Sequence, residues 1–285
     1  FENVDFLKAD LTVPEDVDRV VGSHDIVIQA AANTTGVKDV IERPYVHVAD
    51  NAVMNSLILK SCYDNHVKKF IFFSCTVMYQ TKSQPFLDNP VVESDFNESD
   101  EIYPGYFGVG WTKVYIEKMC EFYSRLGRTK HYVIRHSNIY GPYDKFDTEN
   151  SHMISSAIQK IHFAKEKNYE KVEIWGDGKN KREYMYVADF ADFIMFALKE
   201  FNSIPQNINI GLGYEMTVDE YYEKISKIIG YNGSFTHIKE KPSGIKSKLM
   251  DNKLQLSLGW SAETTVEKGI QHTYNYFLEN ISNYV

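Results

Sequence analysis

The sequence predicts an α/β protein built on a doubly wound parallel sheet, and two observations carry this prediction. Segments typical of strands and of helices alternate along most of the 285 residues, which is the order that βαβ units have. Two of the strand-like segments, DIVIQAAA (25–32) and KKFIFFSC (68–75), are apolar on both faces. Strands inside parallel sheets have this pattern because helices cover both of their faces.

The expected elements follow one another in a regular order. The expected strands are 4–11, 25–32, 68–75, 131–138, 171–176 and 207–211. The expected helices are 14–21, 45–66, 111–126, 187–201 and 218–229. A polar loop is expected over 80–104, and the segments after 229 are shorter and mixed. We therefore expect a first domain from 1–140 and 170–210, and a smaller lobe from 141–169 and 211–285.

Composition excludes several classes of protein. The formal net charge of −8 argues against a surface built as a whole to bind nucleic acid. No apolar run reaches the ~18 residues of a membrane span, and the opening FENVDFLKAD has acids where a signal peptide has an apolar core. Three cysteines, Cys62, Cys75 and Cys120, argue against a disulfide framework and for a reducing compartment. The expected location is the cytoplasm, and no metal site is expected.

The sequence contains no G-x-G-x-x-G motif, with which a dinucleotide-binding fold begins. The first strand-like segment, 4–11, already has the character of a third strand. A sheet that started there would expose an apolar edge, which natural proteins avoid. We therefore expect the first strand–helix–strand unit to lie outside this sequence.

Small and polar residues follow the predicted strands at their carboxyl ends. In parallel sheets these ends form a crevice in which ligands bind. Asp10, Leu11, Ala30, Ala31, Ala32, Ser74 and Asn138 are therefore candidate cofactor-binding residues. The small alanines would let a flat cofactor approach the backbone, although tight packing of strand against helix explains them as well.

Three later segments carry a resemblance to a known family. They are RHSNIYGPYDKFDTENSHMI (135–154), WGDGKNKREYMYVADFAD (175–192) and KPSGIKSKLMD (241–251). The chain resembles the extended short-chain dehydrogenase/reductases of the NAD-dependent epimerase/dehydratase family that act on nucleotide sugars, and within them the GDP-fucose synthase group. The resemblance implies a Rossmann-like fold, NAD as cofactor with NADP as the alternative, and a GDP-sugar substrate.

The resemblance also implies a homodimer with a four-helix interface formed by helices 45–64 and 111–126. Both helices have broad apolar faces, and the residues expected there are Met54, Leu57, Ile58, Ile116, Met119 and Phe122. Burial of these residues against the sheet alone is the alternative.

The implied catalytic residues lie around one unusual stretch, YFGVGWTK (106–113). Lys113 resembles the lysine that holds the nicotinamide ribose and favours the phenolate of a neighbouring tyrosine. The tyrosine would stand four residues earlier, where this chain has Val109. A valine can neither donate nor accept a proton, and the nearest tyrosine, Tyr106, is seven residues before Lys113. The candidates for handling the proton of the sugar oxygen are therefore Lys113, Tyr106, Cys75 and His152, and Tyr106 could reach only if the loop before the helix folds back. Cys75 occupies the position of the family's Ser or Thr, with Thr76 beside it.

Further residues match the substrate site of the family. His152 matches a general acid beside the sugar, and an imidazole suits proton transfer near neutral pH. Asn138 matches a residue that orients the sugar, and Trp175 one that stacks near the guanine. Arg182 and Lys248 match cations that hold the diphosphate, where Arg offers bidentate contacts. The alternatives are a helix-capping histidine, a core tryptophan and ordinary surface cations.

These residues favour a nucleotide-sugar oxidoreductase or epimerase that transfers hydride at sugar C4. The substitution at Val109 favours slow chemistry, such as that of a C4 dehydrogenase, over a fast double epimerase. Two alternatives stay open: a non-catalytic nucleotide-sugar-binding protein of the same fold, and an epimerase or dehydratase of a UDP-, CDP- or dTDP-sugar.

Overall fold

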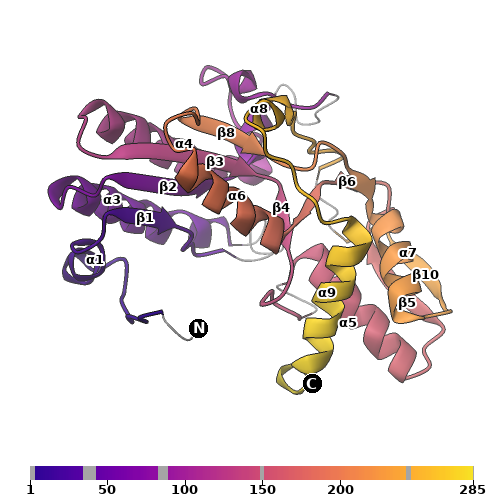
Figure 1. Cartoon of the computed structure of the whole chain (residues 1–285). Helices are drawn as coiled ribbons and strands as arrows, with labels where there is room; N and C mark the ends of the chain where they lie inside the picture. Colours follow the sequence, from indigo (N-terminus) through magenta and orange to yellow (C-terminus); the bar gives the residue numbers. More distant parts are fainter. Residues whose placement is uncertain (1–3, 35–42, 83–88, 148–150, 242–244, 285) are drawn as a thin grey trace.

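The largest sheet of the protein has four parallel strands in the order β1-β2-β3-β8 (Figure 1). The computed structural model describes the chain except residues 1–3, 35–42, 83–88, 148–150, 242–244 and 285. The four strands are Ile26–Gln29, Lys69–Ser74, Lys130–His136 and Asn207–Ile210. All neighbouring pairs in this sheet are parallel. The predicted doubly wound α/β fold is confirmed.

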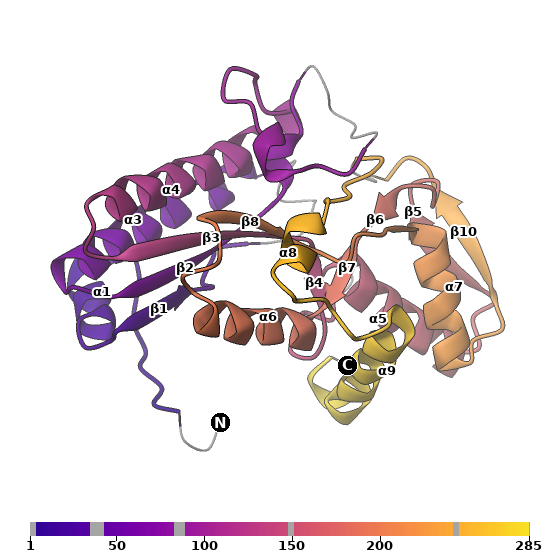
Figure 2. The same ribbon diagram turned by 45° about the horizontal axis from the view of Figure 1, so that its top comes forward.

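Helices cover both faces of this sheet, as Figure 2 shows. One face is covered by α1, α3 and α4 and the other by α6; their bounds are Pro14–Val21, Ala49–Asp64, Phe107–Arg125 and Val187–Lys199. Side chains alternate across a strand, and in β2 Phe70 and Phe72 pack with α3 and α4 while Ile71 packs with α6. This alternation explains why the sequence of β2 is apolar at consecutive positions.

A second group of elements packs around its own apolar cluster. Its helices are α5 (Met153–Glu166), α7 (Val218–Ile229) and α9 (Val266–Glu279), and its parallel strands are β5 (Lys171–Trp175) and β10 (Ser234–Ile238). Val172 and Ile174 of β5 belong to this cluster, although the predicted division placed 170–210 in the first domain. The domain boundaries themselves stay a prediction.

The remaining elements of the described chain are short. They are β4 (Asn138–Tyr140) paired with β7 (Tyr184–Tyr186), β6 (Lys181–Arg182) paired with β9 (Met216–Thr217), α8 (Lys253–Ser257), and the 3-10 turns η1 (Pro44–His47), η2 (Val77–Tyr79), η3 (Glu93–Asp95), η4 (Pro104–Tyr106) and η5 (Ile281–Asn283).

The strand predicted for 4–11 is wrong. Residues 4–10 have no regular structure and Phe6 is 88% exposed. A strand needs a neighbour for its backbone hydrogen bonds, and no strand within the described ranges pairs with this segment. Among the described strands β1 is an edge of the sheet, and its Ile26 and Ile28 are 41% and 42% exposed.

The helix predicted from 111 begins earlier, at Phe107. Glycines usually disfavour a helix by about 1 kcal/mol each, which is why the sequence pattern missed this turn. Here Gly110 lies against Ile102, where an added Cβ would be 2.9 Å from the isoleucine Cδ1. Packing of Ile102 on the bare backbone compensates for the weak helix propensity.

Most of the residues predicted for a dimer interface belong to the core. Met54, Ile58 and Ile116 are buried against the sheet, and Leu57 and Met119 pack beside them. Of the six, Phe122 is exposed, at 55%. The homodimer stays a prediction, but five of the six residues offered for it serve the fold of one chain.

Within the described ranges no helix is both long and apolar enough to cross a bilayer.

Candidate active site

A buried polar network fixes helix α4 to the sheet. Arg135 of β3 and Glu117 of α4 form an ion pair with a 2.6 Å contact, and both side chains are almost fully buried. Ser74 at the end of β2 donates to the same carboxylate. Arg135 also donates to the hydroxyl of Tyr79 at 2.7 Å, and Tyr79 donates to Asn209 of β8 at 2.8 Å. The network therefore ties three strands and α4 into one unit.

The ends of β2 and β3 bring Cys75 and His136 side by side. The register places Ser74, the last residue of β2, opposite Arg135, so Cys75, directly after β2, follows beside His136, the last residue of β3. His136 Nδ1 lies 2.6 Å from the carbonyl oxygen of Ser137. Because a carbonyl oxygen only accepts, Nδ1 carries a hydrogen and Nε2 of the neutral ring is left as an acceptor.

Lys113 points from α4 toward this corner. Its Nζ donates to the carbonyl oxygen of Phe73 at 2.8 Å and lies 4.6 Å from the centre of the Phe72 ring. Burial lowers the pKa of Lys113, and the nearby groups of Cys75 and Glu117 oppose that shift. The lysine is therefore anchored to β2 one residue away from Ser74 and two from Cys75.

Lys248 reaches the same corner from the segment after β10. Burial lowers the pKa of Lys248, with Cys75, Arg182 and Glu183 as the groups that act on its charge. Burial also lowers the pKa of His136 to about 4, and the charges of both Lys113 and Lys248 add to this effect. The structure thus gathers two lysines, a thiol and an imidazole at the carboxyl end of β2 and β3.

Arg182 and Tyr106 extend this group toward the second lobe. Nη1 of Arg182 donates to the carbonyl oxygens of Lys181 and Ile245, each at 2.6 Å. Burial raises the pKa of Tyr106, and the charge of Arg182 opposes that shift. The phenol of Tyr106 therefore lies within reach of the charge of Arg182.

Sequence reasoning missed two groups at this site. His136 belongs to the segment RHSN, and a histidine at the end of a strand is a signal that could indicate it. Glu183 is fully buried, and its carboxylate accepts from the backbone N–H groups of Gly213 at 2.8 Å and Met250 at 3.3 Å. Burial raises the pKa of Glu183 to about 7. No sequence pattern indicates such burial for a glutamate next to an arginine.

The candidate cofactor-binding residues that follow the first two predicted strands lie outside the group of two lysines, a thiol and an imidazole. Asp10 accepts from Thr12 and is exposed, where it shapes the turn before α1. Leu11 packs against the core between the sheet and α3. Ala30, Ala31 and Ala32 follow β1 and are exposed. Exposed small residues at this strand end leave the backbone accessible to a ligand.

Three other candidates are already engaged or enclosed. Ser74 is fully buried and uses its hydroxyl on Glu117, so its side chain positions α4. Asn138 donates through Nδ2 to the backbone oxygen of Glu183 at 2.9 Å, which joins β4 to β7. Thr76 is 1% exposed, and its hydroxyl has no hydrogen-bond partner in the described part of the chain.

His152 and Trp175 have no described contact with Lys113, Lys248, Cys75 or His136, and their roles stay a prediction. His152 is exposed at the N-terminal cap of α5, without a side-chain capping bond. Trp175 ends β5, and the ammonium groups of Lys160 and Lys241 lie 5.0 and 5.2 Å from its ring centre. An aromatic ring between two cations suits a phosphate-bearing ligand, but no described contact joins it to Cys75.

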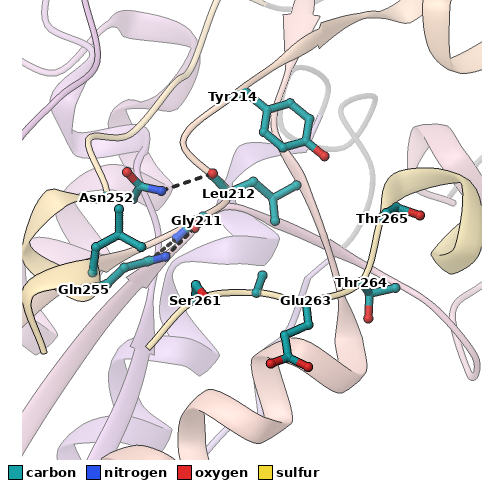
Figure 3. Close-up of a pocket in the computed structure, with 11 residues that line it drawn as sticks. Gly211, Leu212, Tyr214, Asn252, Gln255, Ser261, Glu263, Thr264 and Thr265 are labelled. Carbon is teal, nitrogen blue, oxygen red and sulfur yellow. Dashed lines mark hydrogen bonds between the residues drawn. The ribbon is translucent and has the colours of Figure 1, made fainter. Parts of the chain in front are cut away.

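A pocket of about 240 Å³ lies between the loop after β8, helix α8 and residues 261–265 (Figure 3). Gln255 exchanges two hydrogen bonds with Gly211 there, and Asn252 donates to the carbonyl oxygen of Leu212. None of the predicted site residues lines this pocket.

Comparison with known proteins agrees with the fold and identifies the family. The model of the NAD dependent epimerase/dehydratase family matches residues 2–211. The chain belongs to this family. A GDP-L-colitose synthase of Yersinia pseudotuberculosis is 38% identical over 259 residues, which are 90% of this chain and 82% of that protein. A GDP-L-fucose synthase of Azorhizobium caulinodans is 34% identical over 255 residues, which are 89% and 80%.

A solved structure shares the fold. MlghC, a GDP-mannoheptose C4 reductase from Campylobacter jejuni with NADP bound, has a TM-score of 0.81 and 24% identity. The match covers 95% of this chain and 88% of that one. The resemblance inferred from the three sequence segments is confirmed, and so is the prediction of a nicotinamide cofactor.

The described residues fit the nicotinamide end of such a cofactor. Thr76 offers a buried hydroxyl directly after Cys75 that has no hydrogen-bond partner among the described residues, and Lys113 is anchored to the backbone of Phe73, three residues before Thr76. The exposed alanines after β1 leave room for a flat group at the next strand end. Lys113, Thr76 and the backbone of 30–32 are the residues that would hold it.

Proposed function

We propose that this chain is a nucleotide-sugar oxidoreductase that transfers hydride at C4 of a GDP-linked sugar. The observation that carries the proposal is the convergence of Arg182 and Lys248 with Cys75 and Lys113. Cations suited to a diphosphate thus stand next to a corner suited to a nicotinamide. Two relatives, a GDP-L-colitose synthase and a GDP-L-fucose synthase, support the same assignment.

Each residue has a separate task in this proposal. Arg182 offers a planar guanidinium to the diphosphate, and Trp175 offers a ring face to the base. The bound nicotinamide supplies or accepts the hydride. Lys113 holds the ribose of that cofactor while Cys75 faces the oxygen of the reacting carbon. Burial of the corner strengthens each of these electrostatic contacts because water is excluded.

The direction of the reaction follows from proton handling. Val109 removes the phenol that would lie one helical turn from Lys113, since residues i and i+4 share a face of a helix. Burial lowers the pKa of Lys113 and Lys248, which makes the neutral amine easier to reach, and a neutral amine is a base. We therefore assign the oxidation of the C4 alcohol, the dehydrogenase direction, with the reverse reduction available at high ketone concentration.

Incubation with nicotinamides and nucleotide sugars tests the proposal. GDP-mannose and a 4-keto GDP-hexose are offered with each of NAD+, NADP+, NADH and NADPH, and nicotinamide absorbance is followed. UDP-glucose and dTDP-glucose serve as matched sugars with another base. Turnover confined to the GDP-sugars is expected. Faster turnover of a UDP- or dTDP-sugar would overturn the substrate assignment, and tight GDP binding with no change of the nicotinamide would make the chain a binding protein.

A further inference from the structure

The loop after β1 is fixed by two side-chain amides. The first amide belongs to Gln29, the last residue of β1. Its Oε1 accepts from the N–H of Ala31, and its Nε2 donates to the carbonyl oxygen of Ala31, each at 3.2 Å. Nε2 also donates to Oδ1 of Asn55, on α3, at 3.1 Å. Gln29 is 5% exposed, so its amide is enclosed between the loop and α3.

The second amide belongs to Asn51, in the first turn of α3. Its Oδ1 accepts from the N–H of Asn33 at 2.8 Å, and its Nδ2 donates to the carbonyl oxygen of Asn33 at 2.9 Å. Nδ2 also donates to the carbonyl oxygen of His47 at 3.0 Å. Asn51 is 8% exposed, and both polar atoms of its side chain therefore bind backbone groups.

The two amides hold alternate residues of the loop. Each binds both the N–H and the C=O of one residue, as a residue of an antiparallel partner strand would. Asn55 joins the two amides, because its Nδ2 donates to the carbonyl oxygen of Asn51 at 2.8 Å. Residues 30–32 are exposed, and no described strand pairs with them. The loop thus has a set conformation although it lies at the surface.

A fixed loop at this place favours the binding of a ligand. Parallel sheets bind ligands at the carboxyl ends of their strands, and residues 30–32 are alanines, whose backbone a ligand can approach. A residue that becomes ordered only on binding weakens the affinity by roughly 10-fold. A loop that is already ordered in the free protein avoids this loss, which is the advantage of preorganisation.

We propose that Gln29 and Asn51 are positioning residues for the nicotinamide dinucleotide: they fix Ala31 and Asn33, so that the backbone of residues 30–32 is presented to the cofactor in its binding conformation. Neither side chain touches the cofactor in this proposal. The inference concerns the cofactor alone and goes beyond the proposed function, because it does not depend on which sugar is the substrate.

Asn51→Asp removes the donor of the second amide. The carboxylate still accepts from the N–H of Asn33, but it cannot donate, and it places an oxygen opposite the carbonyl oxygens of Asn33 and His47. Titration calorimetry measures the binding of NADP+ and of NAD+ to the whole protein. For the dinucleotide that wild type binds more tightly, we expect the dissociation constant to rise roughly 10-fold or more.

Asn65→Asp is the matched control on the same helix. Asn65 also donates through Nδ2, to the carbonyl oxygen of Ser61 at 3.0 Å, but it lies at the other end of α3. Its substitution should leave the dissociation constant as in wild type. An unchanged constant in Asn51→Asp, or an equal rise in both variants, would overturn the proposal.

The pH dependence of Asn51→Asp separates positioning from general damage. A protonated carboxyl has one donor and one acceptor, the pair that the amide offers to Asn33. Burial and two facing carbonyl oxygens raise the pKa of a carboxyl at position 51. The dissociation constant of the variant should therefore approach that of wild type between about pH 8 and about pH 5.5. The titratable neighbours His47 and Asp50 are present in both proteins, and a constant ratio between the two would contradict positioning.

Two further measurements are independent of that variant. Gln29→Met keeps the length of the side chain without its amide and should also weaken dinucleotide binding, with folding checked by circular dichroism. In wild type without cofactor, hydrogen exchange followed by NMR should show protected amides at Ala31 and Asn33, although the loop is exposed. Free exchange of both amides, or wild-type affinity in folded Gln29→Met, would refute the inference. A protein that behaves as expected here but turns over no GDP-sugar would contradict only the proposed function.

Discussion

Glu117 of α4 and Arg135 of β3 form an ion pair with a 2.6 Å contact, and only 6% and 4% of their side chains are exposed. Glu117 lies one helical turn after Lys113, on the same face of α4. The pair therefore fixes the rotation of the helix that presents Lys113 to the strand ends. It connects the stability of the fold to the geometry of the candidate active site.

Glu117→Ala is expected to lower the free energy of unfolding by about 3–5 kcal/mol, because removal of one partner leaves a buried, uncompensated charge. Urea denaturation followed by circular dichroism measures it. The control is Glu121→Ala on the same helix, whose pair with Arg125 is exposed and is worth less than about 1 kcal/mol. Similar losses in both variants would mean that the buried pair has no special role.

Arg182→Ala is expected to weaken the binding of GDP by roughly 1.5–3 kcal/mol, the scale of a hydrogen bond to a charged group. Titration calorimetry with GDP measures this change. Lys181→Ala is the neighbouring control, because Lys181 is exposed and has no assigned role in binding. If GDP binds equally to Arg182→Ala and wild type, Arg182 serves the lobe structure through its bonds to Lys181 O and Ile245 O.

Val109→Tyr is expected to give little gain in turnover. A phenol at position 109 would lie one helical turn from Lys113. The site around Lys113, however, already contains Lys248, Cys75 and His136, and these residues are arranged without a phenol. Single-turnover reduction of nicotinamide by a GDP-sugar measures the effect. A gain that reaches the ~10²-fold of a positioned acid–base group would indicate that the chain only lacks its tyrosine, and that no other residue has replaced it.

A homodimer is expected to form through the outer faces of α3 and α4. Val53, Tyr115 and Phe122 are 46%, 47% and 55% exposed there, and Tyr115 bonds Ser56 across the two helices at 3.2 Å. Val53→Asp combined with Phe122→Asp should give a monomer in sedimentation equilibrium at micromolar concentration, because a buried unpaired carboxylate opposes association. Met195→Asp, at an exposed residue of α6, should leave the dimer intact. A monomeric wild type would refute this assembly.

His131 is expected to make the protein less stable in acid. It is 1% exposed, and burial lowers its pKa to about 4. Above its unfolded pKa of about 6.5 neither state is protonated. Between the unfolded pKa and the folded pKa, the histidine binds a proton in the unfolded chain but not in the folded protein. The free energy of unfolding therefore falls as pH falls, by about 1.4 kcal/mol per pH unit. Glu183 has the opposite effect on stability: its pKa is raised to about 7 in the folded protein, so its protonation makes the free energy of unfolding rise as pH falls.

The variant His131→Phe isolates this contribution, since Glu183 and His136 remain in both proteins. The ring sits between Phe70 and Tyr123, and phenylalanine has nearly the same shape. The free energy of unfolding of wild type relative to this variant should fall by ~2–3 kcal/mol from pH 7 to pH 4.5. An equal loss in both proteins would show that His131 does not titrate in this range.

The sequence alone determined the fold class and the family of this protein. Consecutive apolar residues such as Phe70, Ile71 and Phe72 require cover on both faces, and the alternation of strands with helices indicates that helices on two sides of a parallel sheet supply it. The motif segments after Arg135 were sufficient for the resemblance. The sequence also shows that residue 109 cannot act as a proton donor or acceptor, since the side chain of Val109 has no polar atom wherever it lies.

The tertiary structure decided which polar residues lie together. Side chains alternate across a strand, so Ser74 turns to Glu117 while Cys75 is left for the corner, and the register of β2 with β3 places His136 beside it. Lys113 and Lys248 converge because Met250 is buried against η2 and α4. The strand predicted for 4–11 did not form, because a strand also depends on a neighbour, and that dependence is invisible in the local pattern.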